Sequence, residues 1–329
     1  MSAIDAGLRE VDRLDVLVLV DNVTDSLSTT PKHVVSEWTG LRRAGRLPEL
    51  SGAAICCAHH GLSLLIRTHV GDETHAVLFD AGPEGATLRR NSAILGVDFG
   101  QAEAAVLSHG HWDHGGGLLT AVEAIVKARG RVDCFMHPGM FVQRGSRQPD
   151  GAVLAQERVP DPARLTSAGA NVVVTRDPRV IADGTFFVSG EVPRVTPYEV
   201  GLPGHMRHGA DGKSWEPDPL IIDERFIAVR VKDRGVFVFS GCSHAGIVNV
   251  LTHAREVFAS PLYGVMGGFH LSGVNEKIIP ETVGDLKRFG LRVLAPGHCT
   301  GWRATSLMAR EFGDELAPSS VGKQYLLGA

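Results

Sequence analysis

The part of the chain richest in reactive side chains is LSHGHWDHGGGL, residues 107–118, which places three histidines and an aspartate within six residues. Imidazole nitrogens and carboxylate oxygens are ligands that zinc and related divalent ions accept. In an extended segment, residues two apart point to the same side, so His109 and His111 can reach one ion together. Asp113 has the same phase, and His114 follows as the chain turns. One loop is therefore predicted to offer two ligands to each of two metal ions.

Three glycines, Gly115 to Gly117, follow this cluster directly. Glycine lets a backbone turn tightly and pass close to other groups. A helical pattern begins at Leu118. The sequence thus predicts a strand, a ligand-bearing turn and a helix in close succession.

A two-metal site needs further ligands, and four histidines lie at or just past predicted strand ends: His137, His244, His270 and His298. A histidine in such a place is often a hydrogen-bonded structural residue. These four become candidate ligands only because the HxHxDH cluster alone does not supply enough ligands for two metal ions. His244 and His298, in GCSH and PGHC, are the best placed. Cys242 is either a zinc-binding thiolate or a small buried residue. We expect Cys299 to face away from the site.

The elements that must position these residues alternate between strands and helices. Short apolar, β-branched runs predict strands within residues 14–22, 63–68, 75–82, 102–110, 131–139, 171–177, 184–191, 225–231, 235–244, 262–270 and 291–298. Helical patterns cover residues 85–95, 118–128, 247–258 and 280–289. This alternation predicts an α/β fold. Because polar clusters repeatedly end the strands, we expect them to converge on one edge.

No linker divides the chain, so a single domain over residues 1–329 is predicted. Residues 198–219 are rich in glycine, proline and charge, and they are predicted to form a long loop. Such a loop is either a lid over a substrate or a disordered insert.

Composition excludes several classes of protein. The net charge is −4 without a basic block, which argues against nucleic acid. The start of the chain lacks the long apolar run of a signal peptide or membrane span, so we expect a soluble cytoplasmic protein. Five cysteines without CxxC spacing argue against a disulfide framework, and Cys56, Cys57 and Cys134 are expected to be small buried residues. The apolar tail VGKQYLLGA is available to pack on a partner, which leaves a homo-oligomer open.

Taken together, HxHxDH after a strand, the upstream FDAG and the late PGH resemble the metallo-β-lactamase fold superfamily. That resemblance implies an αββα sandwich of two mixed β-sheets flanked by helices, with the metal site at one edge. The segments LVDN, HHGLSLLI, VSGEVPR, GCSHAGIVN, GGFHL and PGHCTG further resemble the branch labelled 7,8-dihydropterin-6-methyl-4-(β-D-ribofuranosyl)-aminobenzene-5′-phosphate synthase.

The resemblance assigns roles to individual residues. It implies that His109 and His111 bind a first metal ion, and that Asp113, His114 and His298 bind a second. Asp80 matches an aspartate that orients a ligand rather than binding metal.

The chain also departs from the superfamily pattern. The mid-chain histidine and the bridging aspartate are missing, and SGEV and SGCS stand in the corresponding turns. We expect His244 to replace the missing ligand, with Cys242 or Glu191 as the next candidates. His59 stands where the branch usually has glutamate.

The predicted function is metal-assisted hydrolysis of a small-molecule ester, lactone, amide or phosphoester. Two zinc ions suit the ligands best, and manganese, iron or magnesium remain compatible. Asp113 is predicted to orient the attacking water or take its proton. His270 is predicted to be an acid, a substrate contact or an outer ligand, and Glu191 and Arg194 are predicted to contact substrate. The alternatives are a synthase-like condensing enzyme and a ligand-binding protein that retains its metal site.

Overall fold

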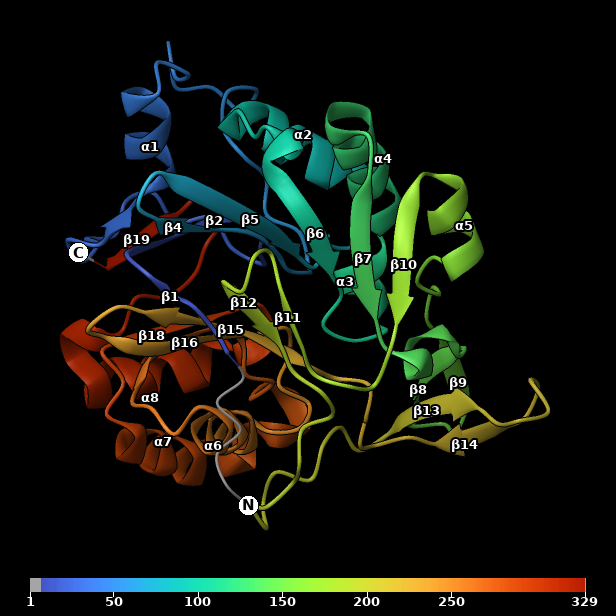
Figure 1. Cartoon of the computed structure of the whole chain (residues 1–329). Helices are drawn as coiled ribbons and strands as arrows, with labels where there is room; N and C mark the ends of the chain where they lie inside the picture. Colours follow the sequence, from blue (N-terminus) through green and yellow to red (C-terminus); the bar gives the residue numbers. More distant parts are fainter. Residues whose placement is uncertain (1–6, 329) are drawn as a thin grey trace.

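The computed structural model describes residues 7–328, so the first six residues and Ala329, the last residue of the tail, lie outside the described part. Our prediction that the start of the chain lacks a signal peptide or membrane span therefore concerns residues that lie partly outside the described part. Two large β-sheets pack face to face, and helices cover the outer face of each (Figure 1). This is the αββα sandwich that the sequence predicts.

The first sheet has eight strands. Their order is β10 (Ala170–Val174), β7 (Val132–Met136), β6 (Ala102–Val106), β5 (Glu73–Phe79), β4 (Ser63–Val70), β2 (Arg13–Val20), β19 (Gln324–Gly328) and β3 (Val34–Val35). Strands β5, β6, β7 and β10 run parallel to one another, and the rest pair antiparallel.

The second sheet has seven strands. Their order is β11 (Arg179–Ile181), β12 (Phe186–Val188), β15 (Phe226–Val231), β16 (Gly235–Ser240), β17 (Leu262–Gly268) and β18 (Val293–Gly297), with β1 (Glu10–Val11) beside β15. Strands β16, β17 and β18 are parallel, so their carboxyl ends meet at one edge. Each of the eleven predicted strands overlaps a strand of these two sheets.

Helices complete the layers. The first sheet carries α2 (Gly85–Leu95), α4 (Leu118–Arg129) and α5 (Pro162–Ser167), and the second carries α6 (Ile247–Phe258), α7 (Ile279–Leu286) and α8 (Trp302–Phe312). The remaining helices are α1 (Glu37–Arg43), α3 (Trp112–Gly115) and the 3-10 turns η1 (Phe99–Gln101), η2 (Pro138–Phe141), η3 (Gly273–Ile278), η4 (Lys287–Phe289), η5 (His298–Thr300) and η6 (Gly313–Glu315). The four predicted helices are confirmed as α2, α4, α6 and α7 with η4, whereas α1, α5 and α8 were not predicted.

Residues 198–219 form more than a loop. They contain β13 (His205–His208) and β14 (Trp215–Pro217), which pair with β8 (Arg144–Arg147) and β9 (Val153–Ala155) in a small sheet of order β14-β13-β8-β9. This sheet lies beside the carboxyl ends of β7 and β10 (Figure 1). The segment escaped prediction because its strands are short and polar, and their partners are distant in the sequence.

The sequence left open whether the tail packs on a partner, and its described part packs within its own chain. Strand β19 pairs antiparallel with both β2 and β3 inside the first sheet. Tyr325 is fully buried, and its hydroxyl donates to the carbonyl oxygens of Ala317 and Pro318 at 2.9 and 3.0 Å. The tail therefore completes the core of its own chain.

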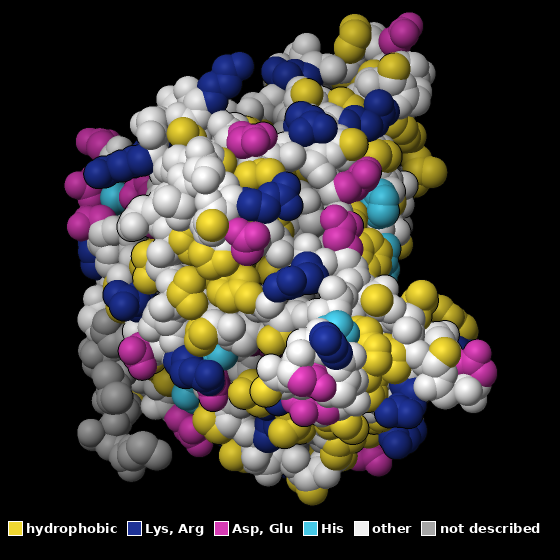
Figure 2. Space-filling view, turned by 90° about the vertical axis from the view of Figure 1, so that its right-hand side faces the viewer, with side chains coloured by type: hydrophobic (Ala, Val, Ile, Leu, Met, Phe, Trp, Pro, Cys, Tyr) yellow, Lys and Arg dark blue, Asp and Glu magenta, His cyan; other side chains and the backbone are white. Residues whose placement is uncertain are grey.

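On the face shown in Figure 2, Lys and Arg side chains lie interspersed with Asp and Glu side chains. This mixture agrees with the small net charge of the chain. Among residues 7–328, helices long and apolar enough to cross a membrane are absent.

The last strand offers a stability test. Tyr325→Ala should lower the free energy of unfolding by about 3–5 kcal/mol, because it removes a large buried ring and its hydrogen bonds. Leu326→Ala, the next residue on the opposite face, has a side chain that is 41% exposed and should change it by less than about 1 kcal/mol. Urea unfolding of both variants checks the difference. Equal losses would contradict the buried pairing of β19.

Candidate metal centre

The candidate site lies where strands of both large sheets end. His109 and His111 follow β6, and His244, His270 and His298 follow β16, β17 and β18. The residues open onto a cavity of about 340 Å³. It is lined by Asn22, His60, His111, Trp112, Asp113, Gln156, Leu202, Cys242, His244, His270, Ser272, His298, Cys299 and Gly301.

A first group of donors consists of His109, His111 and His244, all buried. Nε2 of His109 lies 2.9 Å from Nδ1 of His111, and Nε2 of His244 lies 3.2 Å from the same Nδ1. The structure therefore brings His244 to the pair from the HxHxDH cluster.

A second group consists of Asp113, His114 and His298. Nε2 of His298 lies 3.2 Å from Nε2 of His114 and 3.4 Å from Oδ2 of Asp113. The Cys242 sulfur lies 3.2 Å from Nε2 of His114, and it also falls within 4.8 Å of a His109 nitrogen. Cys242 thus lies between the two groups, in a position suited to bridge them.

Hydrogen bonds behind the site fix which nitrogens carry protons. The Ser108 hydroxyl donates to Asp80 Oδ2 at 2.8 Å, so it accepts from His109 Nδ1 at 2.9 Å. His114 donates from Nδ1 to the same Asp80 oxygen at 2.6 Å. In both rings Nε2 is then unprotonated and directs its lone pair into the site. Asp80 therefore lies where we expected it, behind the ligands.

The same logic applies to His111 and His298. His205 donates from Nδ1 to the Asp218 carbonyl at 2.8 Å, which leaves its Nε2 to accept from His111 Nε2 at 2.9 Å. Nδ1 of His111 is then the free nitrogen. His298 donates from Nδ1 to the Asn22 side-chain oxygen at 2.9 Å, and its Nε2 points toward Asp113.

The contact between His109 Nε2 and His111 Nδ1 would be repulsive without a cation, because it holds two nitrogen lone pairs 2.9 Å apart in a buried space. Burial, together with neighbouring histidines, lowers the pKa values of His109, His111 and His244 well below the usual value, so these rings are neutral. Neutral imidazoles are the form that binds metal. The donor set therefore fits divalent ions.

His298 behaves differently. Burial lowers its pKa, but Cys299 and Asp113 outweigh that effect and raise it to about 9. Without a cation the ring keeps a proton on Nε2 toward Asp113, and a bound ion takes the place of that proton. Loading of the second group should therefore release a proton.

Asp113 receives support that the sequence did not reveal. Asn22 donates to His60 Nδ1 at 3.1 Å, so His60 presents its Nε2 proton to Asp113 Oδ2 at 3.2 Å. Burial raises the pKa of Asp113, but His114, His298 and His60 outweigh it and hold the pKa well below the usual value. We had singled out the neighbouring His59, which instead lies 3.9 Å from a Glu84 oxygen.

The turn itself depends on close backbone approach. Asp113 and His114 belong to the short helix α3, so the extended phase that we expected ends at His111. A Cβ atom on Gly116 would lie 1.8 Å from the Pro83 carbonyl oxygen, and one on Gly117 would lie 2.1 Å from that of Ala81. Larger residues cannot stand there.

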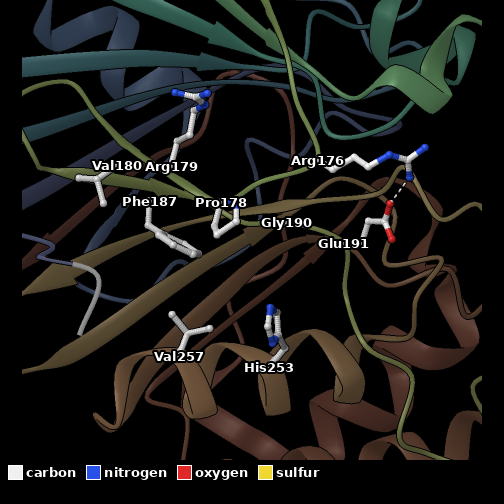
Figure 3. Close-up of a pocket in the computed structure, with 9 residues that line it drawn as sticks. All are labelled: Arg176, Pro178, Arg179, Val180, Phe187, Gly190, Glu191, His253 and Val257. Atoms are coloured by element: carbon white, nitrogen blue, oxygen red, sulfur yellow. Dashed lines mark hydrogen bonds and ion pairs between the residues drawn. The ribbon is translucent and has the colours of Figure 1, made fainter. Parts of the chain in front are cut away.

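Three residues that we predicted for the site lie outside it: His137, Glu191 and Arg194. Glu191 pairs with Arg176 and lies 3.2 Å from His137 Nε2, at the rim of a separate cavity of about 570 Å³ (Figure 3). Arg194 donates to the Leu220 carbonyl oxygen. None of the three lines the 340 Å³ cavity formed by the described residues.

Our expectation for Cys299 was wrong. Its sulfur lies 3.3 Å from that of Cys242, and it lines the cavity.

The sequence analysis missed His205 altogether. The presence of histidine in the glycine-rich segment of residues 198–219 was a usable signal. Of the other cysteines, Cys56 and Cys134 are buried as expected, whereas Cys57 is half-buried, and all five are free thiols.

Removal of the support behind His111 should weaken metal binding. We expect His205→Ala to lower zinc affinity by about 10–100-fold, because His111 loses the partner that orients it. His208→Ala removes another histidine of β13, whose ring packs 4.3 Å from Trp215, and should leave affinity unchanged. Competition with a chromophoric chelator measures both. An unchanged affinity in His205→Ala would exclude this role.

A buried ion pair anchors the small sheet to the ligand loop. Arg144 on β8 donates to Asp223 Oδ1 at 2.5 Å, and Asp223 Oδ2 accepts from Gly110 N at 2.8 Å. Both side chains are buried. Burial raises the pKa of Asp223, but Arg144 outweighs it and holds the pKa below 3.8.

Asp223→Asn should therefore cost about 3–5 kcal/mol of stability at neutral pH. Because the folded pKa lies below the unfolded value, the contribution is present above about pH 4 and is lost as the pH falls toward the folded pKa. Glu216→Gln, in the exposed pair with Arg207, should cost less than about 1 kcal/mol. Unfolding curves at several pH values check this, and parallel pH profiles of wild type and Asp223→Asn would contradict it.

Comparison with known proteins agrees with this geometry. A model of the metallo-beta-lactamase superfamily matches residues 58–209. The chain is 27% identical over 271 residues to the 7,8-dihydropterin-6-methyl-4-(beta-D-ribofuranosyl)-aminobenzene-5′-phosphate synthase of Methanocaldococcus jannaschii, covering 81% of this chain and 89% of that one. It is 31% identical over 255 residues to an uncharacterised protein of the same organism, covering 77% and 88%.

Solved structures show the same fold. Tm1679, described as a metal-dependent hydrolase of the beta-lactamase superfamily, superposes with a TM-score of 0.70 at 24% identity, over 96% of this chain and all of that one. Unliganded yeast PDE1 superposes with a TM-score of 0.54 at 10% identity, over 97% and 100%. By sequence and by fold, the chain belongs to the metallo-β-lactamase superfamily.

Proposed function

We propose that this protein is a metal-dependent hydrolase that binds two ions and cleaves an ester, lactone, amide or phosphoester of a small molecule. One observation carries the proposal: two groups of buried donors converge at the cavity, and in the first group His109 and His111 direct unprotonated nitrogens at one another from rings that Ser108 and His205 fix. A cation bound between these two nitrogens would relieve their repulsion.

The donor set favours zinc. Five imidazoles and a thiolate outnumber the single carboxylate of Asp113, and zinc accepts nitrogen and sulfur ligands more readily than magnesium does. Iron and manganese accept imidazole and carboxylate too, so metal analysis of the purified protein decides among them.

The residues supply binding and orientation. A divalent ion bound by these donors would polarise the scissile group and lower the pKa of a bound water. Asp113 stays ionised, so it accepts a hydrogen bond from water better than it takes up a proton. The His60 side chain is about half exposed at the cavity and contacts Asp113, which places an imidazole between the site and solvent. His270 lines the same cavity and is the predicted acid.

The shape of the site suits a small substrate. The 340 Å³ cavity adjoins a second cavity of about 590 Å³, since Asn22, His298 and Gly301 line both. The second cavity includes Trp302, which is 72% exposed. From residues 198–219, Leu202 lines the 340 Å³ cavity and His205 contacts His111, and we propose that this segment acts as the cover of the site.

The test is hydrolysis by metal-free and reloaded enzyme across a panel of esters, lactones, amides and phosphodiesters. His111→Ala should lower kcat/KM on the best substrate at least about 100-fold, because it removes the donor that contacts both His109 and His244 in the first group. His253→Ala, whose ring lines the separate cavity of Figure 3, should retain activity. Full activity in His111→Ala, or in the metal-free enzyme, would exclude this mechanism.

A second candidate is a condensing enzyme like the synthase to which the chain is 27% identical. It requires a site for the phosphate of its substrate, and Arg194, our predicted contact, is held by the Leu220 carbonyl oxygen. A pterin that co-purifies with the protein, together with failure on the whole hydrolysis panel, would favour the synthase. A tightly bound ligand without turnover of any kind would favour a binding protein.

A further inference from the structure

A third cluster of donors lies on the inner wall of the cavity. It consists of Cys242, His270 and Cys299, whose donor atoms all lie within 4.8 Å of one another. The two sulfurs are 3.3 Å apart. Only Cys242 is shared with the two groups of the metal centre described above.

The topology explains why these three meet. Strands β16, β17 and β18 are adjacent and parallel, and they end at Ser240, Gly268 and Gly297. Each donor comes two residues after the end of its strand. The three side chains therefore lie at equivalent positions, two residues past the ends of three neighbouring strands. No long loop is needed to bring them together.

One nitrogen of the cluster lacks a partner, although Cys299 contacts both Cys242 and His270. Nδ1 of His270 is buried without a hydrogen-bond partner among the described residues. His270 also adopts a φ of +43°, which is unfavourable for a residue with a side chain and directs the ring to this wall. A buried imidazole nitrogen without a hydrogen-bond partner lies here beside two cysteine sulfurs. These three atoms are suited to bind a metal ion.

We propose that Cys242, His270 and Cys299 form a separate binding site for a thiophilic metal ion such as Zn²⁺, Cd²⁺ or Cu⁺. Two sulfurs 3.3 Å apart can both reach one ion at a metal–sulfur distance of about 2.3 Å. Both sulfurs bind the ion as thiolates, so any proton that they carry before binding passes to solvent. The cavity side of the ion stays open, because all three residues line the cavity.

The site differs in chemistry from its neighbours. The other groups contain imidazole and carboxylate, with Cys242 between them, whereas this one offers two sulfurs and one nitrogen, the softest set in the cavity. An ion here draws Cys242 away from the bridging position. The inference does not depend on hydrolysis, since it concerns binding alone.

Cadmium titration of the full-length, reduced, metal-free protein tests it, with the ultraviolet thiolate-to-cadmium charge-transfer band as the readout. The wild type should show the intensity of two thiolates, and Cys299→Ser should show about half. His270→Gln should keep both thiolates but bind at least about 10-fold more weakly. Cys57→Ser, the half-buried thiol next to Cys56, is the matched control and should leave the band of this site unchanged.

Two outcomes overturn the proposal. One is a band of equal intensity in wild type and Cys299→Ser, and the other is an unchanged affinity in His270→Gln. If Cys299→Ser fails to fold, as circular dichroism would show, the affinity of His270→Gln decides alone. His111→Ala separates this site from the hydrolase proposal, because it should lose hydrolysis and retain the two-thiolate band.

Discussion

The structure depends on one electrostatic constraint: neutral imidazoles held with their lone pairs converging in a buried space. The rings of His109, His111, His114 and His298 are each fixed by a hydrogen bond on the far side, to Ser108, His205, Asp80 and Asn22 respectively, whereas Nδ1 of His244 has no such partner among residues 7–328. These outer bonds select the tautomer and prevent the rings from turning away from one another. Folding without a cation must therefore hold repelling groups together, and the surrounding core supplies the free energy to do so.

That core is rigid because the fold is layered. The two sheets bury a continuous apolar interior between them, and each carries its own helical layer. The strand ends therefore cannot shift independently. Strain collects there: Asp80, Ser243, His270 and His298 all have positive φ values, between +43° and +58°, although none is glycine. The apolar layers stabilise backbone conformations that the ligand loops alone would not adopt.

Much of this could be predicted from local sequence. Strands such as β6 and β16 carry their own apolar pattern, and HxHxDH carries its own ligand spacing, so both were found. The small sheet was not, because β8 and β13 lie about sixty residues apart and neither is apolar along its length. The same reason hid His205 and His60, whose roles arise only from contacts made in the folded chain. Cys299 was misjudged because its direction depends on η5, which follows β18 immediately.

Residues 198–219 connect the small sheet to the ligand loop that the local sequence pattern predicts. Strand β13 brings His205 behind His111, while Arg144 on the adjacent β8 pairs with Asp223, which in turn holds Gly110 between the two leading histidines. The small sheet thus contacts the ligand loop at His111 through His205 and at Gly110 through Arg144 and Asp223. A shift of this sheet would therefore also shift the partners of His111, so hydrogen bonds connect the proposed cover to the candidate ligands.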